Sequence, residues 1–162
     1  MSNVTTTGNP PQKRTALSRA VAVSDRVSGI EDIRFLESHC RLDADAARGE
    51  HQVEFAHQVE SSADEANKTL RVIVTFKMTG YRITKKSKRP SVTIGCKLLL
   101  KYKITSLEGL GEDNFTQFAR FNGIYNAWPY WREFVQSMIA RMGLPPLVVP
   151  VFQLSSSRRP AE

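Results

Sequence analysis

The residue types that could do chemistry in this chain are three histidines and two cysteines, and their spacing assembles no reactive centre. His51 and His57 are six positions apart on strand-like sequence and could share a face, while His39 lies on a separate segment. No third ligand stands near the first two, so we predict no metal site. Cys40 and His57 are the types of a thiol nucleophile and its base, but nothing in their positions ties one to the other, and we treat the pair as coincidence.

Motifs of the common enzyme classes are missing as well. Gly109-Leu110-Gly111 lacks the lysine and the spacing of a phosphate-binding loop, and no Gly-x-Ser-x-Gly elbow occurs. We therefore predict that the protein is not an enzyme and uses no cofactor. Cys40 and Cys96 belong to no Cys-x-x-Cys pattern, which favours free thiols in a reducing compartment. The N-terminus has no apolar signal core and no apolar run has the length of a membrane span, so we expect cytoplasmic localisation without membrane insertion.

The net charge of +7 is distributed unevenly along the chain. Residues 31–65 are rich in acids, whereas residues 81–103 contain many bases and no acid. Such segregation predicts a dipolar surface that steers charged partners. The densest run, residues 85–90, begins with Lys85 and is typical of a solvated turn between strands. Basic hairpins also bind nucleic-acid phosphates, so a nucleic-acid-binding module that uses the hairpin Lys85–Arg89 is the alternative from a different functional class.

Composition divides the chain into an arm, a domain and a tail. Residues 1–28 mix Ser, Thr, Pro, Gly and bases, and we expect a flexible basic arm in which a short amphipathic helix could form around Leu17, Val21 and Val27. Residues 29–154 carry the periodic apolar patterns of a folded domain. Residues 155–162 are expected to be a disordered tail.

Apolar side chains at every second position predict four strands, at residues 30–42, 52–60, 70–79 and 92–105. In the first of them, Ile33 and Phe35 share one face, whereas Leu36, Cys40 and Leu42 follow the opposite phase. Such a change of phase within one strand indicates a β-bulge. Alternation of this length is typical of an antiparallel sheet with one covered face and one wetter face.

The next segment predicts a short helix. Glu112 and Asp113 suit the positive end of a helix that carries Phe115 and Phe118, and Asn122-Gly123 is expected to end it. Four strands followed by helices predict an α+β fold: a four-stranded antiparallel sheet followed by a short and a long C-terminal helix.

The long helix has clear boundaries in the sequence. Pro129 suits its first turn, where the missing N–H costs nothing. Gly143 is a natural C-terminal cap, and Pro145-Pro146 prevents continuation. An apolar stripe recurs at helical spacing between these limits. Its members are Trp131, Phe134, Val135, Met138 and Met142.

Residues 115–152 hold more large apolar side chains than one small sheet should bury. We therefore expect either association of subunits or open apolar grooves. The residues assigned to an oligomer interface or the core are Phe115, Phe118, Trp131, Phe134 and Met138.

The C-terminal quarter resembles the SecB family of protein-export chaperones. Asn126-Ala127-Trp128-Pro129-Tyr130, then Arg132-Glu133, then Gly143-Leu144-Pro145-Pro146-Leu147 and an apolar segment ending at Phe152 stand in that family's order. The number and alternation of the strands are also similar.

The resemblance implies an ATP-independent holdase that assembles as a homotetramer, a dimer of dimers with outward-facing sheets and helices between the dimers. Apolar grooves would bind unfolded or aggregation-prone proteins, including preproteins kept competent for translocation. The groove residues that we expect on this chain are Val53, Phe55, Val59, Tyr125, Trp128, Leu147, Val149 and Phe152.

The charge of this chain departs from that family. Its export chaperones offer carboxylates on the sheet to the translocase motor SecA, whereas here bases occupy the wet face of the third and fourth strands. Glu31, Asp32 and Glu37 are the acids that remain as a candidate dock. The basic sheet disfavours handover to SecA and favours an acidic partner. Some SecB-like proteins instead protect the antitoxin of a toxin–antitoxin system, and this is the alternative within the chaperone class.

Overall fold

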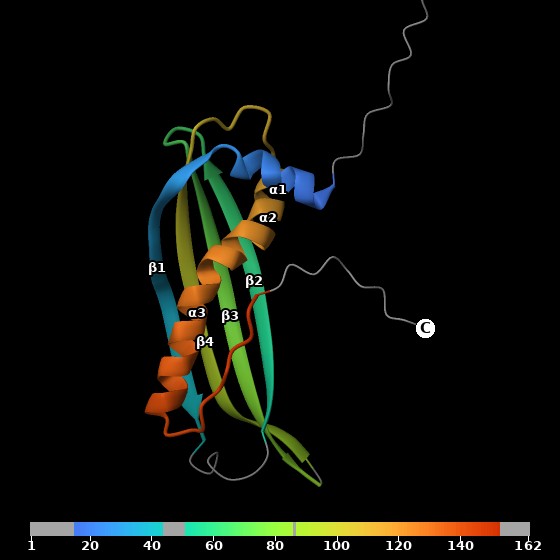
Figure 1. Cartoon of the computed structure of the whole chain (residues 1–162), viewed down its shortest axis with the longest axis vertical. Coiled ribbons are helices and arrows are strands. Elements are labelled where there is room, and N and C mark those ends of the chain that lie inside the picture. Colours follow the sequence, from blue (N-terminus) through green and yellow to red (C-terminus); the bar gives the residue numbers. More distant parts are fainter. Residues whose placement is uncertain (1–14, 44–50, 86, 153–162) are drawn as a thin grey trace, which may run out of the picture.

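A computed structural model describes residues 15–43, 51–85 and 87–152 of the chain. A short helix precedes a four-stranded sheet, and a helical run and an extended segment follow it (Figure 1). The elements are α1 (Ala16–Ser24), β1 (Val27–Leu42), β2 (His51–Asp64), β3 (Thr69–Thr84), β4 (Ser87–Ile104), α2 (Glu112–Phe118), the π-helical η1 (Ala119–Gly123) and α3 (Ile124–Arg141).

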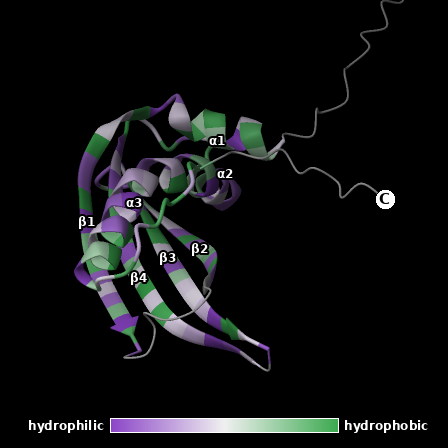
Figure 2. Cartoon of the chain, turned by 60° about the horizontal axis from the view of Figure 1, so that its bottom comes forward, coloured by the Kyte–Doolittle hydropathy of each residue, from purple (hydrophilic) through white to green (hydrophobic). Residues whose placement is uncertain are grey.

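The sheet is antiparallel throughout, with strand order β1-β4-β3-β2. The helices cover one of its faces (Figures 1 and 2). Along β3 and much of β4, buried residues alternate with more exposed ones. Leu70, Val72 and Val74 of β3 are fully buried under the helices, as are Leu98 and Leu100 of β4. The four predicted strands are confirmed, and each extends further than its pattern indicated.

The β3–β4 connection differs from the sequence-based prediction. We expected a solvated turn over residues 85–90, but β4 begins at Ser87 and Ile83 pairs with Lys88. The amide of Ser87 donates to Thr84 Oγ1 (3.1 Å), which tightens the turn. Among the described residues, β2 pairs with β3 as far as Arg82, and the last residues of this hairpin form a two-stranded ribbon beyond that point (Figure 1).

The predicted bulge in β1 is confirmed. The pairing with β4 shifts register between Phe35 and Glu37, so Leu36 is the extra residue. Cys40 and Leu42 pair with buried residues of β4, as Phe35 does. As a result, all three side chains lie on the covered face of the sheet. The bulge therefore keeps the apolar residues of β1 on one side of the sheet, although the sequence alternation changes phase.

The predicted break between two helices at Asn122-Gly123 is wrong. α2, η1 and α3 follow one another without interruption from Glu112 to Arg141. Gly123 has helical backbone angles (φ −60°, ψ −51°), and a Cβ added there would lie 2.7 Å from Val72 Cγ1 of β3. The glycine thus permits close approach of helix and sheet instead of ending the helix. Pro129 lies inside α3 and not in its first turn.

The predicted C-terminal cap of α3 is confirmed. Gly143 has φ +67°, and the amide of Leu144 donates to the carbonyl of Ile139 (3.2 Å). A positive φ at this position is the usual way to end a helix, and it turns the chain back over the sheet. The C-terminal segment, which we define as residues 144–152, then runs beside α3 (Figure 1).

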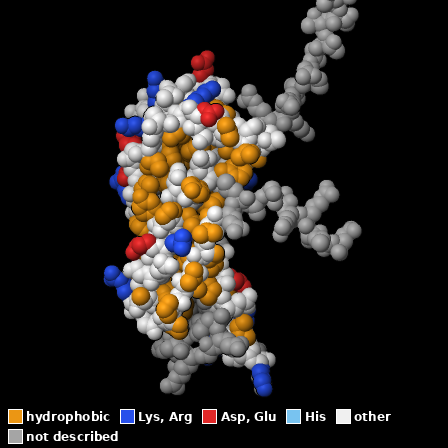
Figure 3. Space-filling view, in the orientation of Figure 1, with side chains coloured by type: hydrophobic (Ala, Val, Ile, Leu, Met, Phe, Trp, Pro, Cys, Tyr) orange, Lys and Arg blue, Asp and Glu red, His pale blue; other side chains and the backbone are white. Residues whose placement is uncertain are grey.

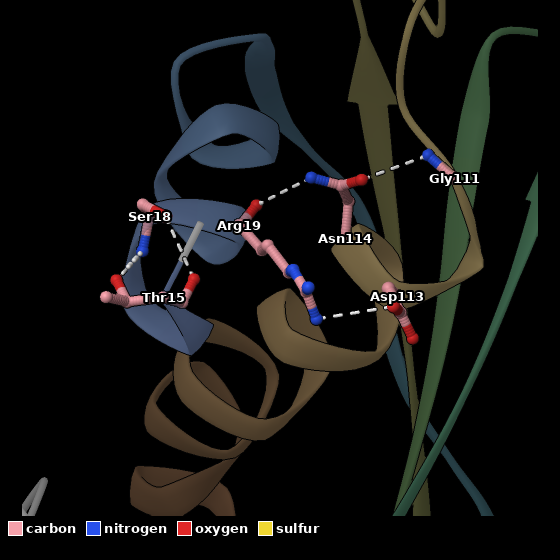
Figure 4. Close-up of polar contacts among 6 residues, drawn as sticks. All are labelled: Thr15, Ser18, Arg19, Gly111, Asp113 and Asn114. Carbon is pink, nitrogen blue, oxygen red and sulfur yellow. Dashed lines mark hydrogen bonds and ion pairs between the residues drawn. The ribbon is translucent and has the colours of Figure 1, made fainter. Parts of the chain in front are cut away.

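Residues 15–28 differ from the flexible arm that we expected over residues 1–28, of which 1–14 lie outside the described part. α1 buries Ala20 and Val23 and is docked on α2 (Figure 4). Arg19 pairs with Asp113 (3.2 Å), and Asn114 Nδ2 donates to the Arg19 carbonyl (3.3 Å). The expected tail at residues 155–162 also lies outside the described part. None of the helices in the described ranges is long and apolar enough to cross a membrane.

Candidate functional site

The helix-side face of the sheet carries the apolar residues predicted to bind clients. In β2 these are Val53, Phe55 and Val59, which pair with Gly80, Met78 and Val74 of β3. The C-terminal segment lies on the same face of the molecule, where hydrophobic side chains gather (Figure 3). All three β2 residues are half-buried and pack against the core. The sheet therefore forms the floor of the candidate site.

The C-terminal segment is held to α3 by defined contacts. Trp128 Nε1 donates to the carbonyl of Pro150 (2.9 Å), and the rings of Trp128 and Phe152 are 5.4 Å apart. Phe152 also contacts His57 of β2, with ring centroids 6.2 Å apart. Val149 is completely buried. The segment therefore occupies part of the groove that the sequence predicted to be open.

Two clefts remain open along this segment. The first, of about 220 Å³, is apolar and is lined by Val53, Met78, Leu144 and Leu147 among others. The second, of about 370 Å³, lies between α3 and the end of the C-terminal segment. Its lining residues are Tyr125, Asn126, Trp128, Pro129, Arg132, Val151 and Phe152.

The predicted groove residues thus divide into three groups. Val53 and Leu147 line the first cleft, whereas Tyr125, Trp128 and Phe152 line the second. The remaining three, Phe55, Val59 and Val149, line neither cleft and pack into or against the core. Their roles in client binding stay a prediction.

Sequence reasoning overlooked Arg132 as a site residue and used it only as part of a motif. It lines the second cleft, and its Nε atom is buried without a hydrogen-bond partner. The available signal was spacing: Arg132 follows Trp128 by four residues and Tyr125 by seven, which places all three on one flank of a helix.

The histidine and the cysteines that the sequence singled out lie apart in the described part of the chain. Partial burial lowers the pKa of His57, whose ring lies against those of Phe76 and Phe152. Cys40 and His57 lie on the two opposite edge strands, about 14 Å apart at the spacing of neighbouring strands, so they form no nucleophile–base pair. Burial raises the pKa of Cys96 to about 12, and both cysteines are free thiols. Within residues 15–43, 51–85 and 87–152, no cluster of His, Cys, Asp and Glu could hold a metal ion.

The residues assigned to an interface or the core are mostly core in a single chain. Phe115, Phe118 and Trp131 are buried, and Trp131 stacks on Phe76 with centroids 5.2 Å apart. Phe134 and Met138 are half-buried against the same core. One chain therefore buries more of the aromatic surplus than we expected, because the long strands and the C-terminal segment cover it.

Large apolar residues nevertheless remain exposed along β1 and on α3, and we refer to them together as the apolar strip. It consists of β1 residues and one tyrosine of α3. The strip residues are Ile30, Phe35, Leu36, Leu42 and Tyr130. Phe35 lies against Phe134, with ring centroids 5.3 Å apart, so the strip continues the packing of α3 outward.

The candidate docking acids are already paired on the open face of the sheet. Glu31 contacts Lys101 and Glu37 contacts Lys97, each at 3.0 Å, while Asp32 contacts Arg34 at 2.5 Å. The hydrogen bond from Lys101 lowers the pKa of Glu31. The face expected to be basic is therefore a mixed array, in which acids of β1 neutralise lysines of β4.

Neither a protein-family model nor a curated protein matches the sequence. The fold is similar to a solved SecB-like chaperone of Mycobacterium tuberculosis, in complex with a ChAD peptide from the HigA1 antitoxin. That match has a TM-score of 0.73 at 20% sequence identity and covers 85% of this chain and 98% of that chain. A protein of unknown function from Streptococcus agalactiae aligns with a TM-score of 0.42 at 11% identity, over 75% of this chain and 95% of that chain, which is too low for an argument. The chain has the SecB-like α+β fold that its sequence resemblance implied.

Proposed function

We propose that this protein is an ATP-independent holdase that binds unfolded or aggregation-prone proteins beside α3. The observation that carries the proposal is the pair of open clefts along the C-terminal segment, on a fold shared with a SecB-like chaperone. Trp128, Leu147 and Phe152 offer apolar contact without a defined polar pattern. Such contact is tolerant of sequence, which suits a protein that must hold many different extended chains.

An antitoxin is the client class that the similar structure suggests. The solved chaperone with this fold binds an antitoxin peptide, and we infer that this chain protects a comparable aggregation-prone partner. The export role rests on weaker grounds. Glu31 and Glu37 are engaged by lysines of the same sheet, so docking to SecA would first have to break those contacts. Holding preproteins for translocation therefore stays a prediction for this chain.

We infer further that the exposed strip of β1 and α3 is covered by another copy of the chain. Phe35, which packs on Phe134 of α3, is 41% exposed, and Tyr130 of the same helix is 43% exposed. Exposed apolar patches of this kind mark interaction surfaces. Light scattering at low and moderate salt measures the mass in solution. A mass near four subunits at both salt concentrations supports the expected homotetramer, and a monomer at both contradicts it.

Suppression of aggregation tests the holdase function. The wild-type protein should keep reduced insulin soluble without ATP, and Trp128→Ala or Phe152→Ala should weaken that effect several-fold because each removes apolar contact area from a cleft. Ile83→Ala is the matched control, since this residue is 43% exposed and lies on the hairpin away from both clefts. If all three variants still assemble and suppress aggregation equally well, the clefts do not bind the client. Polynucleotide binding that weakens steeply with salt would instead favour the basic hairpin and the nucleic-acid function.

A further inference from the structure

The second cleft contains a cation that the fold itself leaves unsatisfied. Arg132 is half-buried on α3, and its Nε atom has almost no contact with solvent and no hydrogen-bond partner. Within the described parts of the chain, no carboxylate pairs with this side chain. A buried donor such as this Nε atom costs free energy when no acceptor pairs with it, which makes the side chain a candidate for binding an external group.

The other polar groups of the cleft do not compensate for this charge. Asn126 Nδ2 donates to the hydroxyl of Tyr102 (3.1 Å), and Trp128 Nε1 donates to the carbonyl of Pro150 (2.9 Å). The cleft residues that the structure describes include no acid. The guanidinium is therefore the one cation among the described cleft residues, which also offer the hydroxyl of Tyr125.

The walls of the cleft are apolar and aromatic. Trp128 and Phe152 lie with their rings 5.4 Å apart, and Tyr125 stands 62% exposed on the same flank of α3. A volume of about 370 Å³ accommodates one large side chain and its neighbour in an extended peptide. The cleft therefore combines one cation with a surface for an apolar side chain.

We propose that this cleft is a carboxylate subsite, in which Arg132 binds an acidic side chain or a chain-terminal carboxylate next to an apolar residue of the bound polypeptide. The guanidinium presents planar N–H donors that match the two oxygens of a carboxylate. A phosphate fits less well, because a doubly charged group requires several donors and the cleft supplies one cation. This inference rests on the proposed client binding and adds a selectivity that apolar contact alone does not give.

Paired peptides measure this selectivity. Two fluorescein-labelled peptides of about ten residues, with blocked ends, share one neutral apolar sequence and differ only in a central Trp-Asp or Trp-Asn. Their affinities are measured by fluorescence anisotropy at physiological salt. The wild-type protein should bind the Asp peptide about tenfold more tightly, the usual strength of a hydrogen bond to a charged group in a partly buried site. A third peptide, neutral but with a free C-terminal carboxylate after Trp, distinguishes a chain terminus from an acidic side chain as the source of the carboxylate.

Substitutions of the arginine decide whether it carries the preference. Arg132→Gln should bind the Asp and Asn peptides equally, and Arg132→Lys should keep part of the preference, because lysine supplies the charge without the planar donors. Arg141→Gln is the matched control, since Arg141 is an exposed arginine at the end of the same helix and should change nothing. Arg132→Gln should also leave thermal stability unchanged or raise it, whereas an arginine needed only for folding would lower it.

Three results overturn the inference. In the first, the wild-type protein binds all peptides with equal affinity. In the second, the preference for the Asp peptide survives in Arg132→Gln. Either result shows that the guanidinium does not bind a carboxylate of the peptide. A smaller assembly mass for Arg132→Gln with unchanged peptide preference shows that the cation serves contact between copies. If the neutral peptide still binds and aggregation is still suppressed, only the carboxylate subsite fails. If no peptide binds and aggregation is not suppressed, the proposed chaperone function fails with it.

Discussion

The docking of the C-terminal segment can be tested by one matched pair of substitutions. Val149 is completely buried, whereas its neighbour Val148 is 76% exposed. Replacing Val149 with alanine removes two methyl groups from the core, a transfer term of about 1.6 kcal/mol. The cavity left behind raises the expected loss in the free energy of unfolding to about 2–3 kcal/mol. Val148→Ala makes the same chemical change at the surface and should cost less than about 0.5 kcal/mol.

Urea unfolding followed by tryptophan fluorescence measures both losses, since Trp128 is bonded to the segment through Pro150. Amide hydrogen exchange over residues 144–152 then shows whether the segment opens by itself or only with the whole domain. Val149→Ala should also weaken client binding, because a loosened segment no longer fixes the walls of the two clefts. Equal stability of the Val148 and Val149 variants would refute the docked position of the segment and the clefts built on it.

Three further predictions follow from single residues. Gly123→Ala should destabilise the protein by about 1–3 kcal/mol in urea unfolding, because its Cβ would meet Val72; combining it with Val72→Ala should restore part of the loss. Because the pKa of His57 is lowered in the folded protein, the unfolded chain binds a proton at this residue first as the pH falls. The free energy of unfolding should therefore decline below about pH 6.5. The decline should be smaller in His57→Gln. Iodoacetamide should label exposed Cys40 in the native protein and spare buried Cys96, whose pKa is about 12, until the chain unfolds.

The strands and the helix cap could be predicted from sequence because each depends on local pattern. Alternation located all four strands, and the change of phase after Phe35 located the bulge. Gly143 was predictable because a glycine before two prolines has few other uses. Strand ends were less predictable. The ribbon beyond Arg82 contains charged residues that suggest a turn, but pairing between neighbouring strands extends the ladder through them.

The helix boundary and the state of the groove depend on tertiary contacts and were not predictable. Asn122-Gly123 is locally a helix-ending pair, and only the close approach of Val72 explains why the helix continues. Likewise, Val149 and Trp128 are apolar residues of the kind that line a groove. The sequence does not show that Trp128 donates a hydrogen bond to the carbonyl of Pro150, or that Val149 is buried in the core. The missing hydrogen-bond partner of Arg132 Nε was equally unpredictable, because no sequence pattern indicates it.

The two edges of the sheet differ in regularity, which bears on the proposed binding of extended chains. β1 shifts register against β4 at three places, whereas the pairing of β2 with β3 runs from His51 to Asp64 without a shift. A bulged edge offers no long row of aligned N–H and C=O groups, while a regular edge can template another strand. A bound polypeptide is therefore disfavoured from pairing with β1 as an added strand. The edge that could pair with it, and so promote irreversible co-aggregation, is β2.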